Sequence, residues 1–169
     1  AVDDRPSLTL GAAPALTEDT AMPDTIVVTA TSPGGAPDEV GQQVDVDVGV
    51  VSGGALLNGA PGINDDGSLA AVLADNAFGS FTLSFTPRDA GGSGAAQQLT
   101  FNVGAVNDPP EATSQSVSIA EDASVTVDVA TGVTPGPLES DTLALTNVVF
   151  TDAANDIVDE GASVIAIVG

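Results

Sequence analysis

The sequence lacks most of the side chains on which enzymes depend. It has no Cys, His, Lys, Trp or Tyr, and its only cationic residues are Arg5 and Arg88. Without a thiol, an imidazole or an amine, there is no usual general base near neutral pH and no activated nucleophile. Paired carboxylates remain, the groups that glycosidases use, but none of the five Phe is clearly available to stack on a sugar. We therefore expect no enzymatic activity.

The scarcity of cations also limits the partners. The net charge is −22, from 24 acidic residues against two arginines, so attraction to nucleic acid or to an anionic membrane surface is excluded. No apolar run approaches the roughly 20 residues of a membrane span, and no signal peptide precedes Ala1. We expect no membrane insertion, and either a mature soluble chain or a piece of something longer.

The unbalanced carboxylates predict a bound cation. Carboxylates within a Debye length of about 8–10 Å repel one another at physiological salt, and the sequence has almost no basic side chain to offset them. Carboxylate and carbonyl oxygens are hard ligands that select Ca²⁺ over zinc or copper. Adaptation to high salt is an alternative origin of the acidity, and Asp45 and Asp47, on the outward face of a predicted strand, fit that alternative.

An internal repeat organises the chain. AVDDRP at 1–6 matches AVNDPP at 105–110, LTEDT at 16–20 matches IAEDA at 119–123, IVVTAT at 26–31 parallels VTVDVAT at 125–131, and APDEVGQQV at 36–44 parallels GPLESDTL at 136–143. The first pair differs by 105 − 1 = 104 positions. Such a period indicates two successive copies of one module, and we predict domains at 1–108 and 109–169.

Alternating apolar residues predict strands in the first copy. The pattern runs through Val44, Val46, Val48 and Val50, through Phe81, Leu83 and Phe85, and through Leu99, Phe101 and Val103. A period of two places each set on one face of a strand. Gly, Pro, Asn and Asp clusters separate the strands, and NDDG at 64–67 is predicted to be a hairpin turn rather than an EF-hand loop. The predicted fold class is all-β, an immunoglobulin-like β-sandwich.

The second copy is shorter than the first. It has counterparts of the early strands at 113–119, 125–130, 142–151 and 162–168, but none of FTLSF at 81–85 or LTFNV at 99–103. A sandwich without two strands leaves an apolar face and open edges exposed. We therefore predict that the sequence is a piece of a longer array, with completion by a strand from a neighbouring chain as the alternative.

The repeated motifs resemble the cadherin-like, immunoglobulin-like tandem repeats of large bacterial RTX-type surface adhesins. The resemblance is carried by AVNDPP, by the repeated Glu-Asp pairs and by the stretch from Gly79 to Val103, and it covers one full repeat and part of a second. It implies an extracellular or bacterial cell-surface location. It also implies Ca²⁺ at the junction between consecutive domains, where the ion stiffens the array.

The resemblance further implies which residues hold the ion. Calcium takes roughly six to eight oxygens, so a junction must collect them from several segments. The predicted junction ligands are Glu18, Asp75, Asn107, Asp108, Glu139 and Asp141, with Asp19 and Asn76 beside them; an equivalent upstream junction would use Asp3, Asp4, Asp38 and Glu39, and a downstream one Glu121 and Asp122. Isolated acids such as Asp24 and Asp89 are predicted to be solvated turn formers.

Together these observations predict a calcium-stiffened extracellular spacer and adhesion repeat, whose partners are neighbouring repeats. Two alternatives stay open. Identical subunits could assemble into an extracellular fibre by strand donation. Loops 33–41 and 86–95 could instead bind cell-surface polysaccharide with the help of calcium.

Overall fold

The chain is built almost entirely from β-strands. The computed structural model describes residues 4–35, 37–118, 120, 125–128, 131–137 and 142–143, and the chain divides into two compact units, Ala1–Val106 and Asn107–Gly169. The helices in the described part are two short 3₁₀ turns, η1 (Pro37–Glu39) and η2 (Gly54–Leu56). No helix among these residues is long and apolar enough to cross a bilayer. The predicted all-β class is confirmed for this part of the chain.

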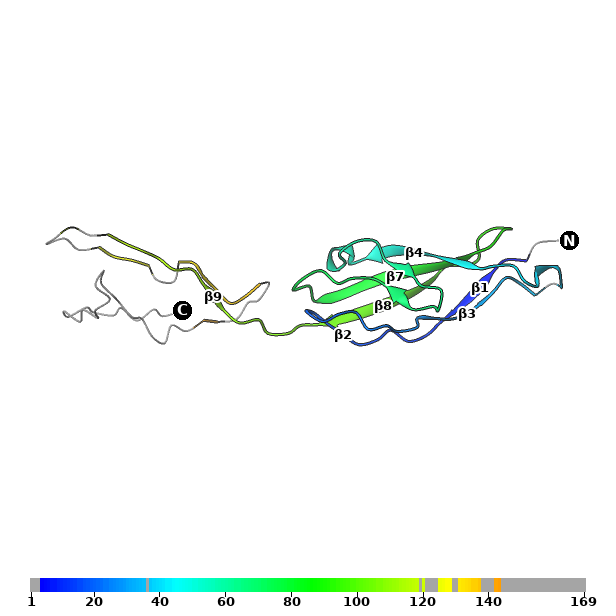
Figure 1. Cartoon of the computed structure of the whole chain (residues 1–169), viewed down its shortest axis with the longest axis horizontal. Coiled ribbons are helices and arrows are strands. Elements are labelled where there is room, and N and C mark those ends of the chain that lie inside the picture. Colours follow the sequence, from blue (N-terminus) through cyan, green and yellow to red (C-terminus); the bar gives the residue numbers. More distant parts are fainter. Residues whose placement is uncertain are drawn as a thin grey trace. The chain divides into compact units, whose positions relative to one another are not determined.

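Unit 1 contains one four-stranded sheet in the order β2-β8-β7-β4 (Figure 1). Its strands are β2 (Leu16–Thr17), β4 (Asp45–Ser52), β7 (Gly79–Arg88) and β8 (Gln97–Gly104). β7 pairs antiparallel with both β4 and β8. The alternating sequences predicted these three strands but not how they pair. β2 pairs parallel with β8, through Leu16 opposite Val103. This parallel pairing was not predicted, because two residues carry no periodicity.

Two smaller sheets complete unit 1. β1 (Ser7–Leu10) pairs antiparallel with β3 (Val28–Ser32), and β5 (Gly62–Ile63) pairs antiparallel with β6 (Leu69–Ala70). The NDDG turn joins β5 to β6, as predicted. The carbonyl of Gly67 accepts hydrogen bonds from the amides of Val27 and Val28, and a Cβ at Gly67 would lie 2.2 Å from the Val28 carbonyl oxygen. Glycine is therefore required at this turn.

The core of unit 1 draws on all three sheets. Phe81, Leu83, Phe85 and Phe101 from the four-stranded sheet are fully buried, and Leu8, Val27, Val28 and Leu69 pack in the same cluster. Phe81 lies opposite Phe101 across β7 and β8, and their rings stack with centroids 4.9 Å apart and 9° between planes. Such a cross-strand aromatic pair adds about 0.5–1.5 kcal/mol beyond its burial.

β4 departs from its predicted inward face at one end. Val46 and Val48 pack against the core and Asp45 and Asp47 are exposed, as alternation predicts. Val50, however, is 45% exposed. Val50 still pairs with Leu83 in the register of Val46 and Val48, and the register shifts only beyond it, between Val50 and Ser52.

Unit 2 repeats the first strand pair of unit 1. β9 (Glu111–Ala112) pairs antiparallel with β10 (Val133–Thr134). Ala112 faces Val133 as Leu8 faces Thr31, and Glu111 faces Thr134 as Ser7 faces Ser32. The offsets are 104 positions on one strand and 102 on the other. The sequence repeat is therefore also a repeat of strand register.

The other predicted strands of the second copy are not found where the structure describes it. Stretches 113–118 and 125–128 contain no strand, so that prediction was wrong for these residues. Val117 and Val125 are 50% and 51% exposed, and strands that bury no apolar face gain little stability from pairing. The predicted strand at 162–168, and all but Thr142 and Leu143 of that at 142–151, lie outside the described residues.

Candidate metal-binding sites

A buried glutamate marks the C-terminal end of unit 1, the end at which β8 finishes (Figure 1). Glu18 directly follows β2, and the alternation that buries Leu16 and exposes Thr17 turns the Glu18 side chain inward. The residue is only 1% exposed. Its Oε1 accepts a hydrogen bond from the Val106 amide at 2.7 Å, whereas its Oε2 is buried and has no partner.

Beside Glu18, two loops are held together in an unusual backbone conformation. Asp19 has φ 57° and Asn76 has φ 53°, and they are the two non-glycine residues with positive φ in the described part of the chain. The amide of Asn76 donates to Oδ1 of Asp19 at 3.3 Å. Left-handed conformations in non-glycine residues cluster at functional sites. Asp19 and Asn76 therefore indicate a candidate functional site at the same end of unit 1 as Glu18.

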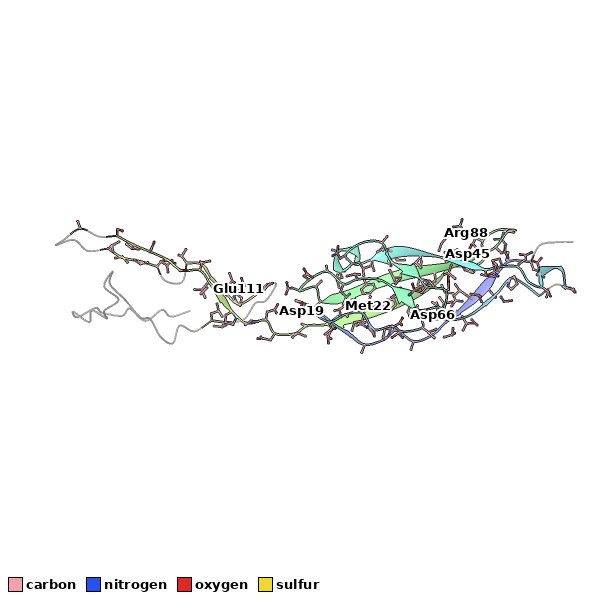
Figure 2. All side chains as sticks on the ribbon, in the orientation of Figure 1. Asp19, Met22, Asp45, Asp66, Arg88 and Glu111 are labelled. Carbon is pink, nitrogen blue, oxygen red and sulfur yellow. The ribbon has the colours of Figure 1, made fainter. Side chains whose placement is uncertain are left out.

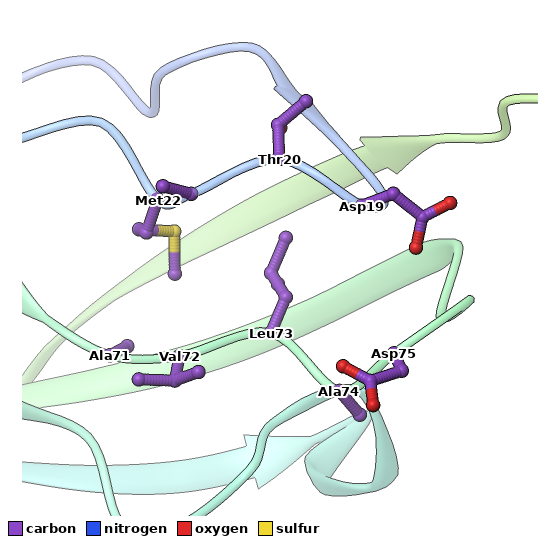
Figure 3. A pocket seen from close by; sticks show the side chains of 9 residues that line it. Asp19, Thr20, Met22, Ala71, Val72, Leu73, Ala74 and Asp75 are labelled. Carbon is purple, nitrogen blue, oxygen red and sulfur yellow. The ribbon is translucent and has the colours of Figure 1, made fainter.

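An open pocket of about 540 Å³ lies next to these loops (Figure 3). Asp19 and Asp75 lie on the same side of it, and Met22, Val72 and Leu73 contribute apolar lining. Asp75 is exposed. The pocket thus places two carboxylates beside an apolar wall.

The N-terminal end of unit 1, where β1 begins, carries a second buried glutamate. Glu39 ends η1, is 2% exposed, and accepts a hydrogen bond at Oε1 from the Asp4 amide at 3.3 Å. Its Oε2 is buried without a partner. The side-chain Oε1 of Gln42 is also buried without a partner, while the backbone amide of Gln42 donates to the Glu39 carbonyl. Glu39 and Glu18 therefore share one arrangement: one oxygen holds a backbone amide and the other is free.

Glycine packs against the linker aspartate in both units. Gly34 has φ 138°, and a Cβ there would lie 2.7 Å from Cβ of Asp4. Gly136 has φ 120°, and a Cβ there would lie 2.9 Å from Cβ of Asp108. Oδ2 of Asp108 is also buried without a partner. Asp4 and Asp108, equivalent in the sequence repeat, are thus equivalent in packing.

The acids at the C-terminal end have no basic side chain near them. Arg88 is the last residue of the ten-residue strand β7, whose first residue, Gly79, pairs with Val103. Arg88 forms an ion pair with Asp47, and Arg5 donates to the Ser93 carbonyl. Figure 2 shows Arg88 well away from Asp19 along unit 1. A ten-residue strand spans about 30 Å, well beyond the Debye length of about 8 Å at physiological salt.

The structure brings together some of the predicted ligands. The backbone amide of Val106 donates to Glu18, that of Asn76 to Asp19 and that of Asp4 to Glu39. Asp38 lies in η1. Asn107 is exposed, and its side-chain amide donates to the Asp108 carbonyl. Asp3, Glu121, Asp122, Glu139 and Asp141 lie outside the described residues. Within those that are described, no three acidic side chains lie close enough together to hold a metal by themselves. Backbone carbonyl oxygens, the side-chain amide oxygens of Asn or Gln, or water would have to complete a site there.

Two features of these sites were not predicted from the sequence. Gln42 was not a candidate, because an amide in a polar loop gives no signal of burial. The contacts of Gly34 and Gly136 with the two aspartates were not predicted either, although each glycine follows a proline. Asp89 forms the predicted turn, because its Oδ1 accepts the backbone amides of Gly91 and Gly92. The prediction that it is solvated was wrong for Oδ2, which is buried without a partner.

No protein-family model and no curated protein matches this chain.

Proposed function

We propose that the protein is a calcium-stiffened spacer and adhesion repeat of an extracellular or bacterial cell-surface protein. In this proposal unit 1 is an immunoglobulin-like, cadherin-like β-sandwich, with the β2-β8-β7-β4 sheet on one side and β1, β3, β5 and β6 on the other. The shared core of these strands supports that architecture. So does the parallel β2–β8 pair, which lets the chain enter at one end and leave at the other.

The observation that carries the proposal is the state of Glu18. Its carboxylate is buried, holds the Val106 amide with one oxygen and leaves the other without a partner. A buried charge without a counter-ion costs several kcal/mol, so a cation bound to Oε2 would remove a large penalty. The chain has no His or Cys, and a purely oxygen ligand set favours Ca²⁺.

Glu39 extends the proposal to the N-terminal end. It holds the Asp4 amide and leaves Oε2 free in the same manner. Calcium at either glutamate would therefore act on a residue where the chain enters or leaves unit 1. Asp19 and Asp75, which line one pocket at the C-terminal end, are further proposed ligands, as are Asn107, Asp108, Glu139 and Asp141. Without calcium, these carboxylates would repel one another and loosen the linkers.

Thermal unfolding in chelator and in millimolar Ca²⁺ tests this proposal. The melting temperature should rise with calcium, because a ligand that binds only the folded state adds ~2.7 kcal/mol at about 100 times its Kd. Glu18→Gln should blunt the rise. Asp45→Asn, which removes an exposed acid from β4, should leave it intact. A wild-type chain that does not respond to calcium would overturn the proposal.

Gel filtration over a range of protein concentrations separates the spacer from the fibre. A spacer repeat elutes as a monomer at every concentration, with or without calcium. Elution that shifts to larger, concentration-dependent species would favour assembly by strand donation instead.

A further inference from the structure

We propose that Asn58 is a site of spontaneous covalent modification, where the side-chain amide converts to a carboxylate through a cyclic imide formed with Gly59. These residues form the single Asn-Gly step of the sequence. They lie between η2 and β5, and both are exposed. The modification would add one negative charge to a chain whose net charge is already −22.

The reaction joins two groups that are already neighbours in the chain. The backbone nitrogen of Gly59 attacks Cγ of Asn58, and the side-chain amide leaves as ammonia, which closes a five-membered succinimide. Water then opens the ring at one of its two carbonyls and gives either aspartate or its β-linked isomer. Water is the only co-reactant, and nothing is oxidised or reduced. Glycine favours the attack because it has no side chain to hinder it and reaches many backbone conformations.

The local structure leaves both reacting groups free. Among the hydrogen bonds of the described residues, none uses the Asn58 side chain or the Gly59 amide. Gly59 has φ 108°, and a Cβ there would meet no atom within 4 Å, so the ring has room to form. The backbone amide of Asn58 is tied to the Val72 carbonyl at 2.8 Å. The reacting atoms therefore lie on the open side of an anchored segment.

The same chain contains a protected counterpart at Asp66 and Gly67, where an aspartate could cyclise in the same way. There the Gly67 amide donates to the Asn64 carbonyl at 2.9 Å, and Oδ1 of Asp66 accepts from the hydroxyl and amide of Ser68. These hydrogen bonds, the Ser68 hydroxyl first, lower the pKa of Asp66. Its carboxylate stays ionised and is a poor electrophile, so this step should be stable in the folded chain.

Peptide mapping by mass spectrometry tests the proposal after incubation of the folded chain at mildly alkaline pH. The peptide that contains Asn58 should lose its unmodified form before any other asparagine peptide, with the mass change of an amide replaced by an acid. Asn58→Gln should abolish the early loss, because glutamine must close a larger ring. If Asn58 keeps its amide while other asparagines convert, the proposal fails.

A second variant tests whether the loop structure decides the rate. Asp66→Asn places another Asn-Gly step in the protected turn and keeps the oxygen that Ser68 uses. In the folded chain the new amide should convert more slowly than Asn58, and in urea the two rates should become similar. Equal rates in the folded chain would overturn the role assigned to the open loop.

Discussion

The buried carboxylate of Glu18 accepts a hydrogen bond from the backbone amide of Val106, 88 residues later in the chain, at 2.7 Å. The contact fastens the residue after β2 to the residue where unit 1 ends. Because β2 also pairs with β8, the Glu18 amide donates to the Gly104 carbonyl at 3.1 Å. Glu18 thus holds this end of the unit with both its backbone and its side chain.

Removing the Glu18 side chain should destabilise unit 1. Glu18→Ala leaves the Val106 amide without its partner, and a hydrogen bond to a charged group contributes about 1.5–3 kcal/mol. Glu18→Gln keeps an acceptor and removes the charge, so in chelator it should be at least as stable as the wild type. Urea unfolding measures both. If the two variants lose equal stability in chelator, the negative charge is required even without calcium, contrary to our expectation.

The packing of Gly34 on Asp4 predicts a large effect for a small substitution. Gly34→Ala combines a positive φ with a methyl group 2.7 Å from Cβ of Asp4, and should cost about 1 kcal/mol or more. Gly59→Ala has a positive φ in open space and measures the backbone cost alone. The difference between their urea midpoints reports the Asp4 contact. Equal midpoints would mean that the linker simply moves aside.

The aromatic stack predicts where the core is most sensitive. Phe101→Ala removes a fully buried ring that stacks on Phe81 and should cost about 3–5 kcal/mol. Thr100→Ala, one residue away, removes a hydroxyl bonded to Thr82 on the exposed face and should cost at most about 1 kcal/mol. Urea unfolding of the two variants gives the comparison. Similar losses would contradict the assignment of faces to β8.

The NDDG turn should make part of the stability dependent on pH. Hydrogen bonds from the Ser68 hydroxyl and amide lower the pKa of Asp66 in the folded state. A lowered folded pKa contributes stability that is fully present above the unfolded value and is lost as pH falls through the folded one. The wild type should therefore exceed Ser68→Ala in stability at neutral pH, and the gap should narrow below about pH 4.

Urea midpoints at several pH values measure this gap. Thr100→Ala provides the control, because its neutral hydrogen bond should give a gap that does not change with pH. If the difference in stability between the wild type and Ser68→Ala stays constant from neutral pH to pH 3, the Asp66 carboxylate is not its cause.

Much of the four-stranded sheet was predictable from local sequence. In β7 and β8 the inward set of Phe81, Leu83, Phe85, Phe101 and Val103 repeats every second residue, and the structure buries all of them. The burial of Glu18 was harder to predict, although the same alternation from Leu16 indicates it, because acids are rarely buried. The exposure of Val50, next to the register shift at the end of β4, breaks the alternation and was not predictable from it.

The candidate sites were less predictable than the strands. The repeat singled out Glu18 and Glu39 as candidate ligands, yet their unpartnered oxygens depend on which backbone amides approach them. Those amides belong to Val106 and Asp4, and their approach is set by the fold as a whole. The contacts of Gln42 show the same limit, since nothing in its sequence context distinguishes a buried amide from a solvated one.

The parallel pairing of β2 with β8 has a mechanical consequence. A pull that separates Asp4 from Val106 drags β2 and β8 in opposite directions along their common axis. The hydrogen bonds between them, together with that from Glu18 to Val106, are then sheared as a group rather than opened one after another. Unit 1 should therefore resist tension along its length without the help of a bound ion.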